Sequence, residues 1–294
     1  MKKRFVTGLT ASMAAVASLV FLESPLMGIL VILLSAMASY EICHVAQLKN
    51  KLFISTAVVV AALTPPILEY RLFERLNVPV FLPLLGYFFL LVIFMLARFE
   101  TTKFMDIFVV LLGSMAVPAA ISCVTSIRWI VLTQDPVREN NLAVYFVFFA
   151  LCAPWFTDIF ALYTGVNLGK HKLCPKISPK KTVEGAVGGL VLAAATNVGF
   201  AVLFNLFWLE QHKIRLWAVL GLSLLLSAFS MMGDLAASVF KRNFGAKDYG
   251  RLFPGHGGVM DRFDSMVFVV PVVFGILQLQ YHYGWALLTE VIAT

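Results

Sequence analysis

Charged residues are scarce in this 294-residue sequence: they make up 13% of it, whereas an ordinary soluble domain carries about 25%. Hydrophobic residues instead reach 60%, and the mean hydropathy is +0.88. This balance excludes a soluble enzyme and a disordered chain. It also argues against a nucleic-acid-binding protein, although the formal net charge is +7.

Cysteine is equally sparse, and there is no glycine period of the kind that fibrous chains have. The four cysteines lie far apart in the sequence and none belongs to a CxxC pair, so they indicate neither a zinc site nor a disulfide framework. They are Cys43, Cys123, Cys152 and Cys174. With these classes excluded, the composition indicates a membrane protein.

Long apolar runs fill most of the chain, and a helix that crosses the hydrocarbon core needs about 20 such residues. Their hydrophobicity is continuous rather than one-sided, which is typical of membrane spans. We therefore predict an all-α, polytopic integral membrane protein with about nine transmembrane helices. The predicted spans are 5–22, 26–43, 52–68, 80–97, 105–123, 142–163, 185–208, 216–232 and 266–289. We expect Pro65 and Pro66 to break the third span, and the stretch 124–135 is open to an interfacial position.

Lysine and arginine indicate the orientation, because cytoplasmic loops are enriched in them. With the N-terminus in the cytoplasm and the C-terminus outside, 17 of the 23 basic residues fall on cytoplasmic segments. The net positive charge is thus largely a topology signal. We expect a bacterial inner membrane, since no transit peptide is evident.

We expect the chain to divide into an N-terminal transmembrane region, 1–141, with about five spans, and a C-terminal transmembrane catalytic region, 142–294. The latter carries two cytoplasmic polar loops, 164–184 and 233–265. The first segment, KKRF followed by an alanine-rich apolar run, resembles a secretory signal. We favour an uncleaved first span.

Carboxylates gather in and beside these two polar loops. Acidic residues at membrane depth are expensive and persist by pairing, binding cations or lining a wet cavity. Asp261 and Asp264 are three residues apart, which on a helix would place both on one face. Together with Asp234 they would form an oxygen-rich site that suits Mg²⁺. The alternative is a lattice of salt bridges with Lys241, Arg242, Lys247 and Arg262. The acids concerned are Asp158, Glu184, Asp234, Asp248, Asp261 and Asp264.

Basic and hydroxyl side chains in the same loops are suited to binding anions. The run Ser178-Pro-Lys-Lys-Thr182 directly precedes the seventh span, and a helix N-terminus beside lysines is a phosphate site. Topology charge and anionic-lipid contact are the alternative explanation. Glycines flank His256 and would let the backbone approach a ligand, which leaves a structural and a catalytic role for this histidine open. These parts together suit phosphoryl or nucleotidyl transfer onto a lipid.

The residues also carry a family resemblance. The elements Ser238-Val-Phe-Lys241-Arg242, Lys247-Asp248, Pro254-Gly-His256-Gly-Gly and Asp261-Arg262-x-Asp264 resemble the signature of CDP-diacylglycerol synthases (phosphatidate cytidylyltransferases). Upstream, Trp155-x2-Asp158, Gly165, Gly169 and Ser178-Pro-Lys-Lys-Thr-x-Glu184-Gly resemble the family in the same order. The N-terminal half is similar only in hydropathy and in Tyr40-Glu41. One departure is Met231, where the family often has Gln.

The resemblance implies that CTP and phosphatidate give CDP-diacylglycerol and pyrophosphate, with Mg²⁺ and a monovalent cation such as K⁺. It implies a homodimer in the lipid bilayer, and no nucleic acid as partner. It carries catalytic roles to Asp234, Lys241, Arg242, Lys247, Asp248, His256, Asp261 and Arg262, and metal binding to Asp234, Asp261 and Asp264. It carries substrate binding to Ser178, Lys181, Thr182, Glu184, Asp158, Ser238, Gly257 and Gly258.

Two other functions are weighed against this one. A membrane transporter of anionic solutes or lipids would suit Asp158 and the broken helices, but neither inverted repeats nor a midplane site is evident. A CDP-alcohol phosphotransferase would require an Asp-Gly-x2-Ala-Arg pattern, which the sequence does not contain.

Overall fold

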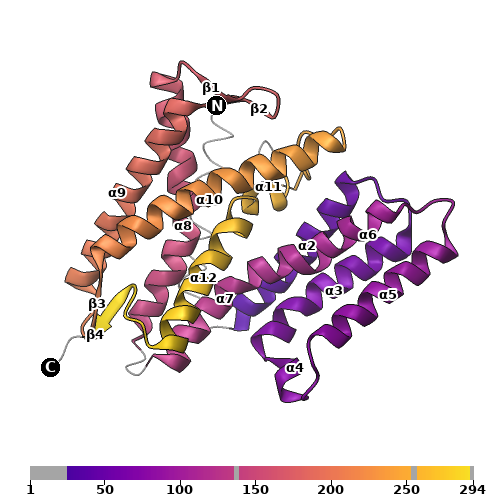
Figure 1. The fold of residues 1–294 in the computed structure, drawn as a ribbon, viewed down its shortest axis with the longest axis horizontal. Helices are drawn as coiled ribbons and strands as arrows, with labels where there is room; N and C mark the ends of the chain where they lie inside the picture. The colour runs from indigo at the N-terminus through magenta and orange to yellow at the C-terminus, as the bar shows by residue number, and fades with distance from the viewer. Residues whose placement is uncertain (1–24, 136–138, 253–256, 292–294) are drawn as a thin grey trace. The chain divides into compact units, whose positions relative to one another are not determined.

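The computed structural model describes residues 25–135, 139–252 and 257–291, which are almost entirely helical (Figure 1). The helices are α2 (Pro25–Val45), α3 (Lys51–Glu69), α4 (Leu72–Arg75), α5 (Phe81–Ala97), α6 (Phe104–Leu111), the π-helical turn η1 (Leu112–Ala116), α7 (Val117–Gln134), α8 (Asn140–Leu168), α9 (Val183–Phe207), α10 (Leu216–Asn243), α11 (Met260–Phe263) and α12 (Met266–Tyr283). Two short antiparallel hairpins join them, β1 (Lys172–Cys174) with β2 (Ser178–Thr182) and β3 (His212–Ile214) with β4 (Thr289–Val291). The predicted all-α class is confirmed.

Seven helical segments in the described part of the chain are long and apolar enough to cross a membrane. An eighth, α5, is apolar but has 17 residues. The predicted first span, 5–22, lies outside the described residues, so the count of nine stays a prediction. The chain is an integral membrane protein.

Prolines disturb the helices less than the sequence predicts. The expected break at Pro65 and Pro66 is wrong: α3 continues through both and ends at Glu69. The two prolines lack the N–H groups that would bond the carbonyls four residues earlier, but these two missing donors do not end the helix. The stretch 124–135 completes a helical segment that begins at Phe104, and an interfacial position for it stays a prediction.

That long segment contains its own proline. Pro118 has no N–H to donate to the carbonyl of Ser114. The Thr64 hydroxyl of α3 donates to this carbonyl instead, at 3.2 Å, and the adjacent π-helical turn takes up the irregularity. A neighbouring helix thus satisfies the freed backbone group, as membrane helices require.

The chain forms two compact units. The first combines the residues up to Ser122 with Lys241–Phe263, so the second half of the predicted signature belongs with the N-terminal helices. Within this unit α2 packs against α3, and α6 and η1 pack against both. Its core is apolar and consists of Cys43, Phe53, Ala57, Leu91, Ile107 and Val110.

The second unit contains Cys123–Phe240 and Asp264–Thr294, with α8 and α9 packed along each other. Small residues allow their close approach. A Cβ on Gly189 would stand 2.8 Å from the Ala161 side chain and from the Thr157 carbonyl oxygen, so only glycine fits there. Small residues at helix crossings are the usual device where no hydrophobic effect drives association.

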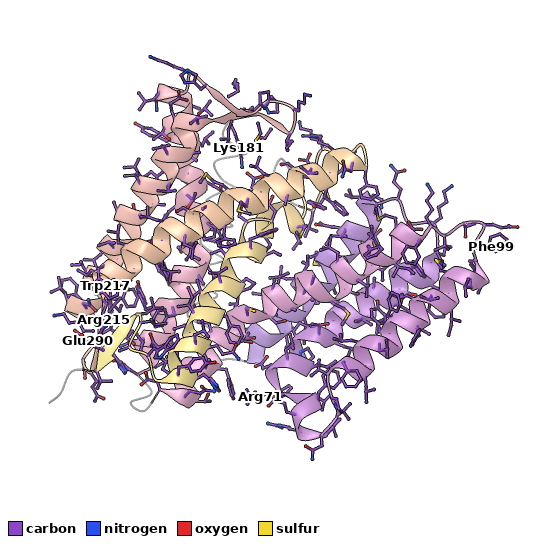
Figure 2. All side chains as sticks on the ribbon, viewed as in Figure 1. Arg71, Phe99, Lys181, Arg215, Trp217 and Glu290 are labelled. Carbon is purple, nitrogen blue, oxygen red and sulfur yellow. The ribbon has the colours of Figure 1, made fainter. Side chains whose placement is uncertain are left out.

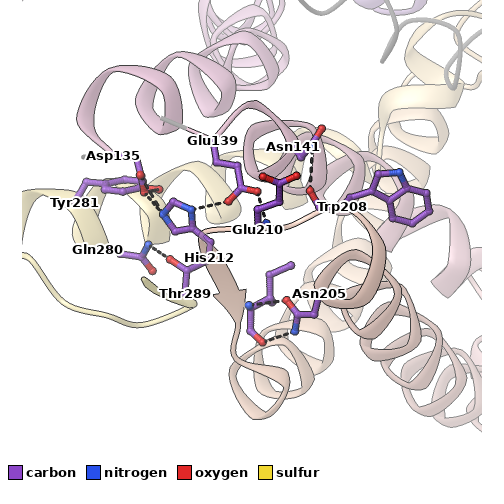
Figure 3. A network of polar contacts seen from close by, with 11 residues as sticks. Asp135, Glu139, Asn141, Asn205, Trp208, Glu210, His212, Gln280, Tyr281 and Thr289 are labelled. Atoms are coloured by element: carbon purple, nitrogen blue, oxygen red, sulfur yellow. Dashed lines mark hydrogen bonds and ion pairs between the residues drawn. The ribbon is translucent and has the colours of Figure 1, made fainter. Parts of the chain in front are cut away.

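A buried histidine ties together one end of the second unit (Figure 3). His212 is 1% exposed; its Nδ1 lies 2.8 Å from Glu139 Oε2 and its Nε2 lies 3.1 Å from Asp135 Oδ2. The Tyr281 hydroxyl donates to Asp135 at 3.1 Å. The His212 imidazole therefore joins the end of α7 to the start of α8, and α12 joins the same cluster through Tyr281. Figure 2 shows Arg215 and Glu290 at the same end, where they form an ion pair at 3.4 Å.

We predict that His212→Ala destabilises the protein strongly. The change would remove the imidazole that contacts both carboxylates, and breaking such a largely buried cluster costs about 3–5 kcal/mol. Thermal unfolding in detergent should show a clearly lower Tm. Arg215→Ala is the control, because its pair with Glu290 is exposed and such pairs contribute about 0–1 kcal/mol. An equal Tm for the two variants would contradict the account.

Candidate functional site

The predicted anion-binding run lies where the sequence places it. Ser178–Thr182 forms β2, which leads directly into α9. Thr182 is the N-cap, and its hydroxyl oxygen accepts a hydrogen bond from Gly185 N at 3.1 Å. The capping oxygen satisfies one of the amides that a helix start leaves without a partner. The position at the start of a membrane-spanning helix is confirmed; phosphate binding there stays a prediction.

Glu184 faces the loop that follows α8. Its Oε2 accepts from Lys170 N at 3.0 Å, and its Oε1 lies 2.6 Å from His171 Nδ1. Because His171 N also donates to this carboxylate, at 3.2 Å, the side chain fixes the loop to the first turn of α9. Glu184 thus holds the hairpin in place, and a direct contact with substrate remains a prediction.

Lys181 forms an ion pair with Asp234 of α10, and both side chains are about three-quarters buried. Figure 2 shows Lys181 at the hairpin. Lys181 Nζ is close to the Asp234 carboxylate, but among the described residues it forms no hydrogen bond of regular geometry. The ammonium group therefore has N–H donors to offer an anionic ligand.

Three carboxylates of the second unit interact electrostatically around that single ammonium group. Asp158, on α8, is exposed and interacts with Asp234 and with Asp264, which lies between α11 and α12. Three acids and one lysine leave an excess of negative charge, and carboxylate oxygens are the donors that Mg²⁺ prefers. The chemistry of the donor set fits a divalent cation. In the part of the chain that the structure describes, however, no three acidic, histidine or cysteine side chains stand close enough together to hold an ion as they are.

The signature residues of the first unit form a separate polar cluster around Asp261. Lys241 is 8% exposed, and its Nζ donates to Asp261 Oδ1 at 2.8 Å. Asp261 Oδ2 accepts from Tyr249 N at 2.7 Å and from Gly258 N at 2.9 Å. The Lys241 ammonium also lies 5.1 Å from the centre of the Tyr249 ring. The Lys241–Asp261 pair is therefore fixed from both sides.

The remaining predicted residues are placed around these clusters. Gly257 has a φ of +87°, which favours glycine, and a Cβ there would meet the Asp261 carboxylate. Arg242 is exposed and donates to the Ala246 carbonyl at 2.9 Å. Lys247, Asp248 and Arg262 are exposed, and Ser238 is half-buried on α10. His256 lies outside the described residues.

Asp261 and Asp264 do not share a helix face, so that prediction is wrong. The helix α11 contains Asp261 but ends at Phe263, and Asp264 follows it. Asp264 accepts from Ser265 N at 2.8 Å. Asp261 belongs to the first unit, whereas Asp234 and Asp264 belong to the second, and each unit is described by itself.

Sequence reasoning gave no role to Glu41, which lies at the end of α2 and is 7% exposed. Its carboxylate accepts from Val259 N at 2.9 Å and from Met260 N at 2.8 Å. The available signal was an acidic residue inside an apolar run, in a chain with few acids. Such a residue needs a partner, and its partner lies 218 positions away.

Comparisons with known proteins identify the family. The chain is 40% identical over 136 residues to a phosphatidate cytidylyltransferase of Staphylococcus aureus (strain COL), 41% over 152 residues to that of Staphylococcus saprophyticus, and 42% over 146 residues to that of Bacillus subtilis (strain 168). These alignments cover 46%, 51% and 49% of this chain, and 50%, 56% and 52% of the relatives. The chain thus spans about half the length of the curated relatives it matches. The model of the cytidylyltransferase family matches residues 2–280, and the chain therefore belongs to that family.

Proposed function

We propose that this membrane protein is a phosphatidate cytidylyltransferase, which transfers a cytidylyl group from CTP to phosphatidate. A phosphate oxygen of phosphatidate attacks the α-phosphorus of CTP, the bond from that phosphorus to the bridging oxygen breaks, and pyrophosphate leaves. The product is CDP-diacylglycerol. The observation that carries the proposal is the Lys241–Asp261 ion pair. It lies within the signature segment, and the cytidylyltransferase family model matches residues 2–280 of the chain.

The reaction needs no strong general base. The second pKa of a phosphomonoester is about 6, so the attacking oxygen is already anionic near neutral pH. The remaining task is to bring two polyanions together and to stabilise the pyrophosphate that leaves, which positioning and charge neutralisation accomplish. Because the acyl tails remain in the bilayer, a site at helix ends suits a lipid headgroup.

The basic side chains are the proposed phosphate ligands. Lys181 and Lys241 each stand against a carboxylate, so an incoming phosphate can take over an ammonium group that is already oriented. Phosphate oxygens accept charge-assisted hydrogen bonds well from such groups. Exposed residues of the signature and hydroxyls of the hairpin complete the proposed set, which is Arg242, Lys247, Arg262, Ser178 and Thr182.

Mg²⁺ is the proposed divalent cofactor, and the proposed metal-binding residues are Asp234 and Asp264 in the second unit and Asp261 in the first. When bound, the ion would neutralise phosphate oxygens and the leaving pyrophosphate. The excess of carboxylates over ammonium groups around Asp158 supports a cation in the second unit. A monovalent cation such as K⁺ and a homodimer belong to the same proposal.

The proposed location is a bacterial inner membrane, with the N-terminus inside and the C-terminus outside. The contact of Glu41 with Val259 and Met260 supports this topology, because it brings the end of α2 to the signature segment. The loop after α2 and the signature are both predicted to be cytoplasmic. The transporter alternative is set aside, since the matched family and relatives are transferases.

We predict that the purified protein releases pyrophosphate from CTP when Mg²⁺ and phosphatidate are present. Asp261→Asn and Asp234→Asn should each slow turnover by roughly 100-fold or more, because charge placed at the reacting phosphates is lost. Glu74→Gln is the control, since Glu74 is exposed and pairs only with Arg71 of its own turn in the described structure. Near-normal rates in both aspartate variants would remove the proposed metal ligands.

Lys181 tests the anion-binding role of the hairpin. We expect Lys181→Met to slow turnover by roughly 100-fold, because an ammonium group beside the phosphates is lost. Its Tm should fall as well, since the pair is about three-quarters buried and the change leaves Asp234 without its ammonium partner; turnover is therefore measured at a temperature where the variant stays folded. Lys213→Met, on an exposed position of the other hairpin, is the matched control. Normal turnover with a much lower Tm would indicate a structural ion pair instead.

A further inference from the structure

The carboxylate of Glu41 joins two segments that are far apart in the sequence. Its Oε1 accepts from Val259 N at 2.9 Å and its Oε2 accepts from Met260 N at 2.8 Å. Both bonds are buried, and the residue is 7% exposed. Each of the two oxygens thus accepts a hydrogen bond from one of two consecutive backbone amides at the start of α11.

In the part of the chain that the structure describes, the acceptor of both amides is the Glu41 carboxylate. The first amides of a helix lack intrahelical acceptors, and a buried donor without an acceptor is costly. A buried carboxylate is costly too unless it is hydrogen-bonded. The contact therefore gives the buried amides an acceptor and the buried carboxylate its donors. Neither segment alone can supply both.

The backbone around Glu41 is shaped to admit it. A Cβ on Gly258 would collide with both carboxylate oxygens, and a Cβ on Gly250 would collide with one of them. Both glycines belong to the segment that carries Lys241, Tyr249 and Asp261. Their lack of a side chain thus leaves room for the Glu41 carboxylate.

The same short stretch of backbone also holds Asp261. Gly258 N donates to Asp261 Oδ2 at 2.9 Å, and the next two amides donate to Glu41. Asp261 in turn accepts from Lys241 at 2.8 Å. Glu41 therefore fixes the peptide groups that orient Asp261 toward Lys241, and each of its own oxygens accepts a hydrogen bond from one backbone amide.

We propose that Glu41 is a positioning residue for the cytidylyl transfer, acting through the 258–260 backbone on Asp261. It contacts neither substrate. The inference rests on the proposed function for its effect on rate, whereas the contact itself is a matter of geometry. It gives the N-terminal half of the chain a direct part in the site, although sequence resemblance to the family is weak there.

Glu41→Gln tests this, because glutamine keeps the size but presents an NH₂ group to one of the two amides. We expect the 257–263 peptide to exchange its backbone hydrogens about tenfold faster by mass spectrometry, since one buried acceptor is lost. Turnover should fall about tenfold, and more Mg²⁺ should be needed for the half-maximal rate. Ser39→Ala is the matched control on the same helix, because the Ser39 hydroxyl is buried and has no hydrogen-bond partner among the described residues.

The double variant Glu41→Gln/Asp261→Asn separates positioning from a general structural role. If Glu41 acts through Asp261, the double variant is no slower than Asp261→Asn alone. Multiplied losses overturn the proposal, as does faster exchange with normal turnover, or equal losses in Ser39→Ala. If the wild-type protein releases no pyrophosphate, the proposed function fails and the positioning role fails with it. The exchange data then still decide the contact, so the two failures are distinguishable.

Discussion

A carboxylate at the end of a membrane-spanning helix must find a partner, because an unpaired charge next to apolar surroundings is costly. This constraint organises the polar half of the structure. Asp234 pairs with Lys181, Asp261 with Lys241, and Glu41 with two backbone amides. Near the start of α10, the His212 ring contacts the carboxylates of both Asp135 and Glu139. Each contact joins segments that the sequence separates widely, so charge compensation fixes the tertiary structure where apolar packing cannot specify it.

The same contacts suit the proposed chemistry. An ammonium–carboxylate pair can open without large motion when a phosphate takes the ammonium group and a cation takes the carboxylate. Lys181–Asp234 and Lys241–Asp261 are both of this kind. The glycines near Asp261 let backbone amides reach its carboxylate, so that the group keeps its orientation while its partner changes. In the proposed reaction, the charges of CTP and phosphatidate would thus be neutralised by ion-pair residues that also stabilise the protein without substrates.

Hydropathy predicts the spans well, because continuous apolar runs leave few alternatives in a membrane. The Ser178–Thr182 run could also be placed at a helix start, since the cap and the apolar run are adjacent in sequence. Other features of the fold and the site could not be predicted from the sequence. The continuation of α3 through Pro65 and Pro66 could not be predicted, because proline is ordinarily a helix-breaking signal. The end of α11 before Asp264 could not be predicted either, because a four-residue helix is too short to show periodicity. Tyr40-Glu41 was marked by the family resemblance, but Glu41 could be given no role, because its partners lie more than 200 residues away and no local pattern predicts such a contact.

The most direct test of the central claim is the fate of labelled CTP with a panel of lipid phosphates. With the label on the α-phosphate, we predict that radioactivity enters the lipid phase when phosphatidate and Mg²⁺ are present. With the label on the γ-phosphate, it should remain in water as pyrophosphate. Transfer of the γ-label to lipid would indicate phosphoryl transfer instead, and no lipid label from either position would contradict the proposed cytidylyl transfer.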